Sequence, residues 1–354
     1  MRRPLSVITT GAALAGIAAA GGLAVTMANG TGAELPSAAY QAWCTTSKLC
    51  TYTIDDSSGI RDLRIGRATW VGVDEELPPS EARLAGGPIA YYPTMLSGIA
   101  VAINIPGING QGVNLTGETL GDIFSGTVTN WNAGRIRATN RHLRLPTSLP
   151  ITLCVPRRAS GESWDMSEYL AKVSPTFRKR VGGESLKPRW KGDVVRVSHV
   201  SQMGECMAAR KGGITFLPVA DAMREGLTHD IVAVGKREKV TIKVGNTGKT
   251  KTVVRHVFIH PTERAVQKAG HFAATNEKSD LTVDLTNSAA PGAYPITIEA
   301  YAVVRKDRKM SAATRKTLAY FLSPKAQAML PGLGYAPLPK SQLAQARQQL
   351  KTAR

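Results

Sequence analysis

Aromatic and acidic residues are both scarce in this chain of 354 residues. Phe, Trp and Tyr together make up 6% of it, which is too little for the aromatic stacking platforms that bind single-stranded nucleic acid. Asp and Glu number 26 against 45 Lys and Arg, so the formal net charge is +19. Such an excess attracts anions of some kind: nucleic acid, an anionic polymer or a small anionic ligand. The basic residues are spread along the chain rather than grouped in a block, so the sequence does not indicate a nucleic-acid-binding tail.

Patterns that carry catalysis or bind metals are also missing. The four cysteines lack the paired C-x-x-C spacing of a zinc site. His256 and His260 are four residues apart, but the residues around them are strand-like, so this spacing does not place both side chains on one helical face. The other histidines lie near no serine or cysteine turn that is typical of a nucleophile. We therefore expect no enzymatic activity, no metal ion and no cofactor.

Charged residues are absent between Arg3 and Glu34. Arg2 and Arg3 precede a run rich in Ala, Gly, Leu and Val, which is the pattern of a secretory signal peptide. We expect this leader to comprise residues 1–28, with cleavage as late as residue 33. The alternative is an uncleaved membrane anchor, because the uncharged run is long enough to span a bilayer. In both cases the sequence predicts a secreted or extracytoplasmic protein, for which nucleic acid is not a plausible partner.

The cysteine count agrees with export. An even number of cysteines in an exported chain suggests two disulfides, although four cysteines allow three pairings. The sequence favours pairing between neighbours, Cys44 with Cys50 and Cys154 with Cys206, because the shorter of these loops closes easily.

Beyond the leader, short strand-like runs alternate with amphipathic helical stretches. This alternation predicts an α/β protein, and the length fits roughly two domains. Strands are predicted over residues 49–54, 69–73, 99–105, 151–155, 214–218 and 296–304. Helices are predicted over residues 60–65, 117–124, 312–322 and 341–350, and another runs through Met166, Tyr169 and Leu170. Residues 240–257 predict a β-hairpin with an exposed basic tip.

Two strand-to-helix turns carry hydroxyl groups. Residues 157–163 (RRASGES) follow a predicted strand and precede a predicted helix, and residues 57–59 (SSG) repeat the arrangement earlier in the chain. Backbone N–H groups at a helix start, together with a serine hydroxyl and a guanidinium, can bind an anion. Ordinary helix capping requires the same residue types, so the turns alone leave both interpretations open.

The order and spacing of several motifs decide between these interpretations. From Glu34 to the C-terminus, the chain resembles the phosphate-binding proteins of bacterial phosphate ABC transporters. The motifs that carry the resemblance are residues 36–43, 57–59, 70–77 (WVGVDEEL), 99–107 (IAVAINIPG), 120–126 with Asn130 and Trp131, 157–161, 212–214, 294–296 and 334–339.

This resemblance implies a fold and a division into lobes. The expected fold is the two-lobed α/β fold of type II periplasmic binding proteins, in which crossover strands join the lobes and a ligand lies in the cleft between them. We expect residues 34–98 and 300–354 to form one lobe and residues 99–299 to form the other.

The same resemblance implies a set of ligand residues. Ser57 matches the serine of the first turn, and Asp74 matches an aspartate that accepts a proton from bound phosphate. Arg158 matches the arginine that contacts the anion, and Ser160 with Gly161 matches the Ser-Gly pair of the second turn. We expect Arg158 to be the main charge contact, with Ser57, Asp74 and Ser160 lining the same cleft from opposite lobes.

Three positions near this expected site depart from the family pattern. Glu34 and Leu35 stand where the family has a Thr-Phe pair, Asp56 replaces a glycine, and Glu162 replaces the threonine after the Ser-Gly pair. A carboxylate about 4 Å from a bound anion repels it by roughly 1–4 kcal/mol, depending on the local dielectric. If Glu162 points into the cleft, it competes with the ligand for Arg158. If it points into solvent, it is an ordinary first-turn glutamate favoured by the helix dipole.

These features predict an exported solute-binding protein. It would bind phosphate or another small anion in the cleft and deliver it to an ABC permease in the membrane. The alternative is a secreted, wall-associated interaction or sensor protein with a degenerate cleft, held by its positive charge to anionic cell-wall polymers.

Overall fold

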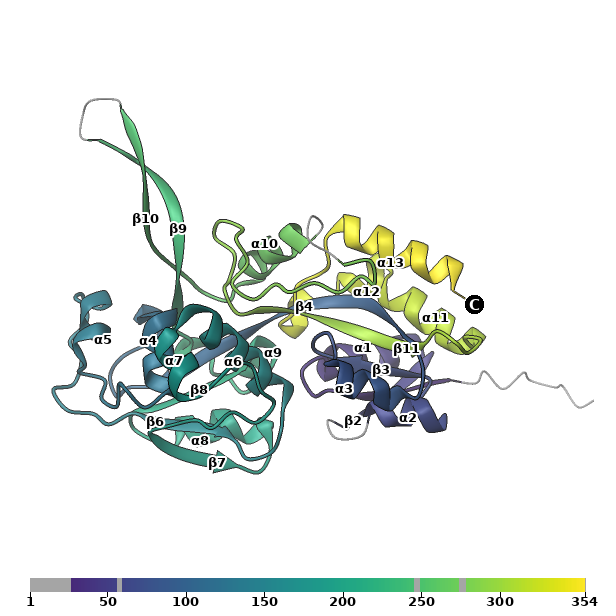
Figure 1. Ribbon diagram of the computed structural model, residues 1–354, viewed down its shortest axis with the longest axis horizontal. Coiled ribbons are helices and arrows are strands. Elements are labelled where there is room, and N and C mark those ends of the chain that lie inside the picture. Colours follow the sequence, from purple (N-terminus) through teal and green to yellow (C-terminus); the bar gives the residue numbers. More distant parts are fainter. Residues whose placement is uncertain (1–26, 56–58, 245–248, 274–277, 354) are drawn as a thin grey trace, which may run out of the picture.

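The computed structural model describes residues 27–55, 59–244, 249–273 and 278–353. Two groups of helices and strands are joined by two long strands, β4 (Ile89–Asn104) and β11 (Thr297–Arg305) (Figure 1). We call the group built from the N-terminal and C-terminal elements lobe 1 and the group built from the middle of the chain lobe 2. Among the described helices, none has the length and apolar character needed to cross a membrane.

Lobe 1 consists of three parallel strands with helices packed around them. The strands are β1 (Ala28–Gly32), β2 (Cys50–Ile54) and β3 (Trp70–Val73), and the helices are α1 (Ser37–Ser47), α2 (Gly59–Ile65), α3 (Pro79–Ala82), α11 (Ala312–Phe321), α12 (Pro324–Gln327) and α13 (Lys340–Thr352). Its core contains an aromatic cluster whose contacting rings lie 4.9 to 5.9 Å apart. The cluster consists of Tyr40, Trp43, Tyr52, Trp70 and Phe321.

Strand β1 is not predicted by the sequence, because its residues belong to the uncharged stretch that predicts the leader. It lies between β2 and β3 and pairs with both. A Cβ placed on Gly30 would lie 2.1 Å from the ring of Trp70, and one on Gly32 would lie 2.1 Å from the carbonyl oxygen of Gly72. The small residues that suggest a leader therefore also meet a steric requirement of the sheet. Residues 28–32 precede Glu34, where we expected the first lobe to begin.

Lobe 2 contains a second group of strands covered by helices. The strands are β6 (Thr152–Pro156), β7 (Asp193–Val197) and β8 (Gly213–Pro218), and the helices are α4 (Gly117–Phe124), α5 (Gly134–Thr139), α6 (Gly161–Val173), α7 (Pro175–Arg180), α8 (Met203–Ala208) and α9 (Val219–Arg224). The two lobes share one sheet of eight strands in the order β2-β1-β3-β11-β4-β8-β6-β7. Short 3-10 helices span Arg83–Ala85, Gly110–Gly112, Val200–Gln202, Thr228–Asp230 and Pro331–Leu333.

Strand β4 passes from one lobe to the other. It pairs with β11 up to Gly98 and with β8 from Ile99 onward. The predicted strand over 99–105 covers only its second half. Pro93 and Gly98 resemble turn signals, but Pro93 lies next to a shift of register opposite Ala300 and Tyr301, where a residue without an N–H group is tolerated.

The predicted hairpin is confirmed and is longer than the sequence indicates. Strands β9 (Ala233–Lys243) and β10 (Thr250–Ile259) pair antiparallel, and β5 (Asn114–Thr116) adds a third strand. The hairpin projects well away from lobe 2 (Figure 1). Its turn, residues 245–248, lies outside the described residues. Helix α10 (Glu263–Ala273) follows the hairpin and packs against β4 and β11.

Both predicted disulfides are confirmed. Cys44 in α1 bonds to Cys50 at the start of β2. Cys154 in β6 bonds to Cys206 in α8 and closes a separation of 52 residues. The second bond fixes the strand that leads into the turn before α6, which supplies two of the expected ligand residues.

Candidate ligand-binding site

The loop after β3 in lobe 1 meets the start of helix α6 in lobe 2. Asp74 directly follows β3, and Gly161 is the first residue of α6. A Cβ placed on Gly161 would lie 1.8 Å from Oδ2 of Asp74, so a larger residue at this position requires the Asp74 side chain to shift. Asp74 is 7% exposed. The contact brings two of the predicted ligand residues together from opposite lobes, and a carboxylate at a helix N-terminus is electrostatically favoured.

Ser160 is the N-cap of α6. Its hydroxyl oxygen accepts a hydrogen bond from the backbone N–H of Ser163 (3.2 Å) and donates one to the Ser163 hydroxyl (3.0 Å). Ordinary capping, one of the two interpretations of this turn, is therefore observed. Capping does not exclude ligand binding, because the first N–H groups of a helix have no acceptor within the helix.

A cavity of about 350 Å³ opens around this contact, and we call it the turn cavity. Three of the five predicted ligand residues line it: Asp74, Ser160 and Gly161. Lobe 1 also contributes the charged residues Asp55, Arg61, Glu75 and Glu81, together with Gly59, to the lining of this cavity.

The two remaining predicted ligand residues are placed differently. Ser57 lies outside the described residues, although Asp55 and Gly59 on either side of it line the turn cavity. Arg158 is exposed, and it is not among the described residues that line the turn cavity. The arginine that lines this cavity is Arg61 in α2, which is also exposed. The sequence does not single out Arg61, because no motif includes it and only the fold brings it to the cavity.

Of the residues that depart from the family pattern, Asp56 lies outside the described residues, whereas Glu34, Leu35 and Glu162 are described. Leu35 is 1% exposed and packs in the core, where its carbonyl oxygen accepts a hydrogen bond from the Tyr335 hydroxyl (2.6 Å). Glu34 is half-buried. Glu162 is 2% exposed, and it is not among the described residues that line the turn cavity. The solvent-exposed orientation considered for Glu162 is therefore not observed.

A second cavity of about 260 Å³ lies on the other side of Asp74, and we call it the acidic cavity. Asp74 and Glu75 line both cavities. Burial raises the pKa of Glu75 to about 12, and the negative charges of Asp165, Asp74, Glu168 and Glu81 add to this effect. In the ligand-free protein Glu75 is therefore a neutral acid at neutral pH.

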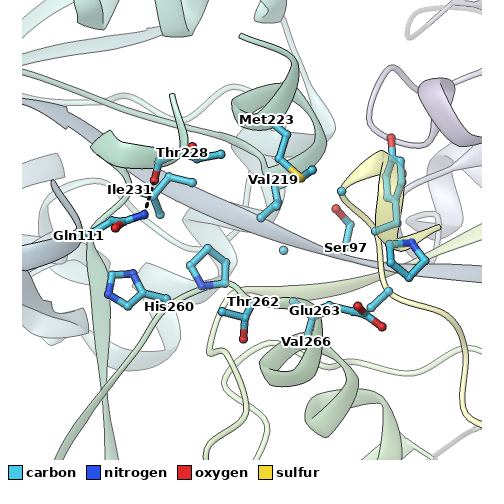
Figure 2. A pocket seen from close by; sticks show the side chains of 16 residues that line it. Ser97, Gln111, Val219, Met223, Thr228, Ile231, His260, Thr262, Glu263 and Val266 are labelled. Carbon is cyan, nitrogen blue, oxygen red and sulfur yellow. Dashed lines mark hydrogen bonds between the residues drawn. The ribbon is translucent and has the colours of Figure 1, made fainter. Parts of the chain in front are cut away.

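The largest of these cavities, about 410 Å³, lies where β4 passes between the lobes, and we call it the hinge cavity (Figure 2). Its walls are mainly apolar and include Val219, Met223, Ile231 and Val266. Burial lowers the pKa of His260 on its wall, so this ring is neutral at neutral pH. None of the predicted ligand residues that the structure describes lines this cavity, and it offers no fixed positive charge to an anion.

Comparison with known proteins agrees with the predicted fold. The family model described as "PBP superfamily domain" matches residues 9–325. The "Phosphate-binding protein PstS" of Haemophilus influenzae is 26% identical over 339 residues, which cover 91% of this chain and 92% of that protein. The "Phosphate-binding protein PstS 2" of Mycobacterium tuberculosis is 26% identical over 308 residues, covering 82% and 76%.

Solved structures give the same result for the fold. A high affinity periplasmic phosphate-binding protein (PfluDING), solved with bound phosphate, superposes with a TM-score of 0.66 at 20% identity, covering 92% of this chain and 94% of that chain. The phosphate-binding protein of Stenotrophomonas maltophilia superposes with a TM-score of 0.63 at 16% identity, covering 91% and 93%. The predicted two-lobed α/β fold of periplasmic binding proteins is confirmed.

Proposed function

Because this chain belongs to the PBP superfamily domain family, we propose that it is an extracytoplasmic solute-binding protein that binds phosphate, or a closely related oxyanion, and delivers it to the permease of an ABC transporter. The curated relatives are named phosphate-binding proteins, and the match to this chain covers most of their length. They are binding proteins, and we assign no catalytic step to this chain. Their names give no support to anionic cell-wall polymers as partners.

The observation that carries the proposal is the turn cavity. It is lined by Asp74 of lobe 1 and by Ser160 and Gly161 of lobe 2, which are three of the five ligand residues that the family resemblance implies. The N-terminus of α6 offers backbone N–H groups and a partial positive charge to an anion. Arg61 supplies a full positive charge and donors that suit a phosphate oxygen. Asp74, when ionised, accepts a hydrogen bond from a protonated phosphate oxygen.

Phosphate must share this space with the Asp74 carboxylate, which lies against the start of α6. For the anion to reach the helix N–H groups, the loop after β3 and the start of α6 must separate. Rotation of the two lobes about β4 and β11 provides such a motion, as in other proteins that close around a ligand.

Two further assignments belong to this proposal. Lobe 1 comprises residues up to 98 and from 300 onward, and lobe 2 comprises residues 99–299; the change of β4 partner between Gly98 and Ile99 supports this division. A leader peptide, if removed, is cleaved before Ala28, because Ala28 begins a strand between two others.

Calorimetry with phosphate and sulfate at neutral pH tests the proposal. Phosphate carries a proton that Asp74 can accept, whereas sulfate carries none at this pH. The wild-type protein should bind phosphate and reject sulfate, and Asp74→Asn should weaken phosphate binding by about tenfold or more, since a hydrogen bond to a charged group contributes about 1.5–3 kcal/mol. Glu184→Gln, an exposed change outside both cavities, should leave binding unchanged. A wild-type protein that does not bind phosphate would overturn the proposal.

A further inference from the structure

The acidic cavity is lined by an unusual number of carboxyl groups for a protein with a large positive net charge. Seven acidic side chains line it, contributed by the loop after β3, by α6, by the segment before β11 and by β11 itself. They are Asp74, Glu75, Glu76, Asp165, Glu168, Asp284 and Glu299. A cavity lined in this way repels anions and attracts cations.

Lysine side chains balance some of these charges. Lys278 forms an ion pair with Glu76. Lys172 pairs with Glu168 (2.9 Å) and with Asp284 (2.5 Å). Oε2 of Glu299 accepts a hydrogen bond from the Gln342 side chain (2.9 Å). These contacts leave the inner wall of the cavity, formed by Asp165 of α6 and by Asp74 and Glu75 of the loop after β3, with more carboxyl groups than cations.

Asp165 on this inner wall is a buried carboxyl group without a hydrogen-bond partner in the described part of the chain. It is 1% exposed, and both of its carboxyl oxygens are without a hydrogen-bond partner among the described residues. It lies four residues after Gly161 and three before Glu168, so all three occupy the same face of α6. A buried polar group without a partner costs about 1–3 kcal/mol. Side chains of this kind are rare in folded proteins and call for a specific explanation.

We propose that the acidic cavity binds an organic cation, an alkylammonium compound of the size of a short diamine. Its ammonium groups would donate hydrogen bonds to Asp165 and Glu75. This site is separate from the proposed phosphate site, although Asp74 and Glu75 contribute to the walls of both.

The walls of the cavity favour an organic cation over a metal ion. In the described parts of the chain, no three acidic, histidine or cysteine side chains come together in a way that could hold a metal ion. A volume of about 260 Å³ is also far larger than one ion needs. Trp164, Val283, Leu285 and Ile298 supply apolar surface between the carboxyl groups. Methylene groups of a diamine can pack against this surface, and the tryptophan ring attracts an ammonium group.

Cation binding should release protons. Burial, followed by the charges of Asp74, Glu162 and Glu168, raises the pKa of Asp165 well above its usual range, and Glu75 is shifted in the same direction. Glu75 is neutral in the empty cavity, burial favours the protonated form of Asp165, and an ammonium group beside them favours the ionised form of both. Each carboxyl that ionises gives its proton to the buffer. The affinity for the cation should therefore rise as the pH increases, as long as the amine itself stays protonated.

Titration with putrescine at constant ionic strength tests this inference. The wild-type protein should bind it near pH 8, with an enthalpy that changes with the ionisation enthalpy of the buffer. Asp165→Asn keeps the shape of the side chain and removes its charge, so it should weaken binding by about tenfold or more, which is 1.4 kcal/mol or more. Glu184→Gln is the matched control and should bind as the wild type does. A thermal melt of each ligand-free variant shows that it is folded.

Three results would overturn the inference: no putrescine binding by the wild type, equal binding by Asp165→Asn, or binding of calcium in place of putrescine that depends on Asp165. Phosphate binding is measured on the same samples. A protein that binds phosphate but not putrescine contradicts only the organic-cation site. A protein that binds putrescine but not phosphate contradicts only the proposed function.

Discussion

The turn cavity and the acidic cavity lie on either side of Asp74, and the same helix supplies both with opposite chemistry. The start of α6 presents Ser160, Gly161 and backbone N–H groups to the turn cavity. One turn further on, the same helix presents Asp165 and Glu168 to the acidic cavity. The positive net charge of the chain therefore does not predict the charge of the residues that line its cleft. A chain with a formal charge of +19 encloses a cavity lined by seven carboxyl groups.

The substitution Gly161→Ala should disturb both cavities at once and have the largest effect. The new methyl group would lie 1.8 Å from Oδ2 of Asp74, so the Asp74 side chain must leave its position against the start of α6. Inserting a methyl group into a packed site costs roughly 1–3 kcal/mol. We expect affinities for phosphate and for putrescine to fall together, by about ten- to a hundredfold, in calorimetric titrations. An unchanged affinity for both would show that the close approach of Asp74 to Gly161 contributes to neither site.

The substitution Glu75→Gln should change how the stability of the ligand-free protein depends on pH. The pKa of Glu75 is raised by burial from 4.5 in the unfolded chain to about 12. Its contribution to stability is therefore complete below about pH 4.5 and is lost as the pH rises toward the folded value. Near pH 8, Glu75→Gln should raise the free energy of unfolding of the ligand-free protein by at most about 5 kcal/mol, because this pH lies about 3.5 units above the unfolded pKa of 4.5 and each unit corresponds to about 1.4 kcal/mol.

Chemical denaturation at two pH values checks this expectation. The gain from Glu75→Gln should be present near pH 8 and absent near pH 4. A gain of the same size at both values would show that it comes from packing and not from the proton held by Glu75.

Phosphate titrations of Arg61→Ala and Arg158→Ala test which of the two arginines contacts the anion in the turn cavity. Arg61 lines the cavity, whereas Arg158, which matches the family arginine, is exposed outside it. We expect Arg61→Ala to weaken phosphate binding by about tenfold, since hydrogen bonds to charged groups contribute about 1.5–3 kcal/mol. Arg158→Ala should change it by less than about threefold. The reverse order of effects would restore Arg158 as the main charge contact and mean that the lobes close differently around the ligand.

Ser160→Ala should have the smallest of these effects on stability. It removes the cap hydrogen bond to the N–H of Ser163, and loss of an N-cap costs about 0.5–2 kcal/mol. Ser160→Gly serves as the control, because glycine at this position costs only a few tenths of a kcal/mol. Equal unfolding free energies for Ser160→Ala and the wild type, measured by denaturation, would contradict the capping role.

The sequence predicts the parts of this molecule that depend on neighbouring residues. Helix α4 and the turn before α6 follow from local capping and periodicity, and the disulfides follow from the export signal and the short loop. Asp74 is predicted through its place in a motif. Strand β1 is not predicted, because glycines that fit under Trp70 and beside Gly72 have the composition of a leader.

The parts that the sequence does not predict depend on distant segments. Arg61 reaches the turn cavity only because α2 lies opposite the start of α6. The acidic cavity combines acidic side chains from positions 74–76, 165, 168, 284 and 299, and all of them except Asp74 look like ordinary polar surface residues in the sequence. Glu162 is buried, and its local sequence does not decide between the two orientations considered for it.

A titration of phosphate in the absence and presence of saturating putrescine tests the central claim, that Asp74 separates an anion site from a cation site. Protons released from Asp165 and Glu75 compensate for the incoming positive charge, so the net charge beside the turn cavity changes little. We expect phosphate to bind in both titrations, with affinities within about threefold of each other. Such a difference corresponds to less than 1 kcal/mol of coupling between phosphate and putrescine. Loss of phosphate binding in putrescine, with the apparent affinity falling in proportion to its concentration, would show a single shared site and contradict the account.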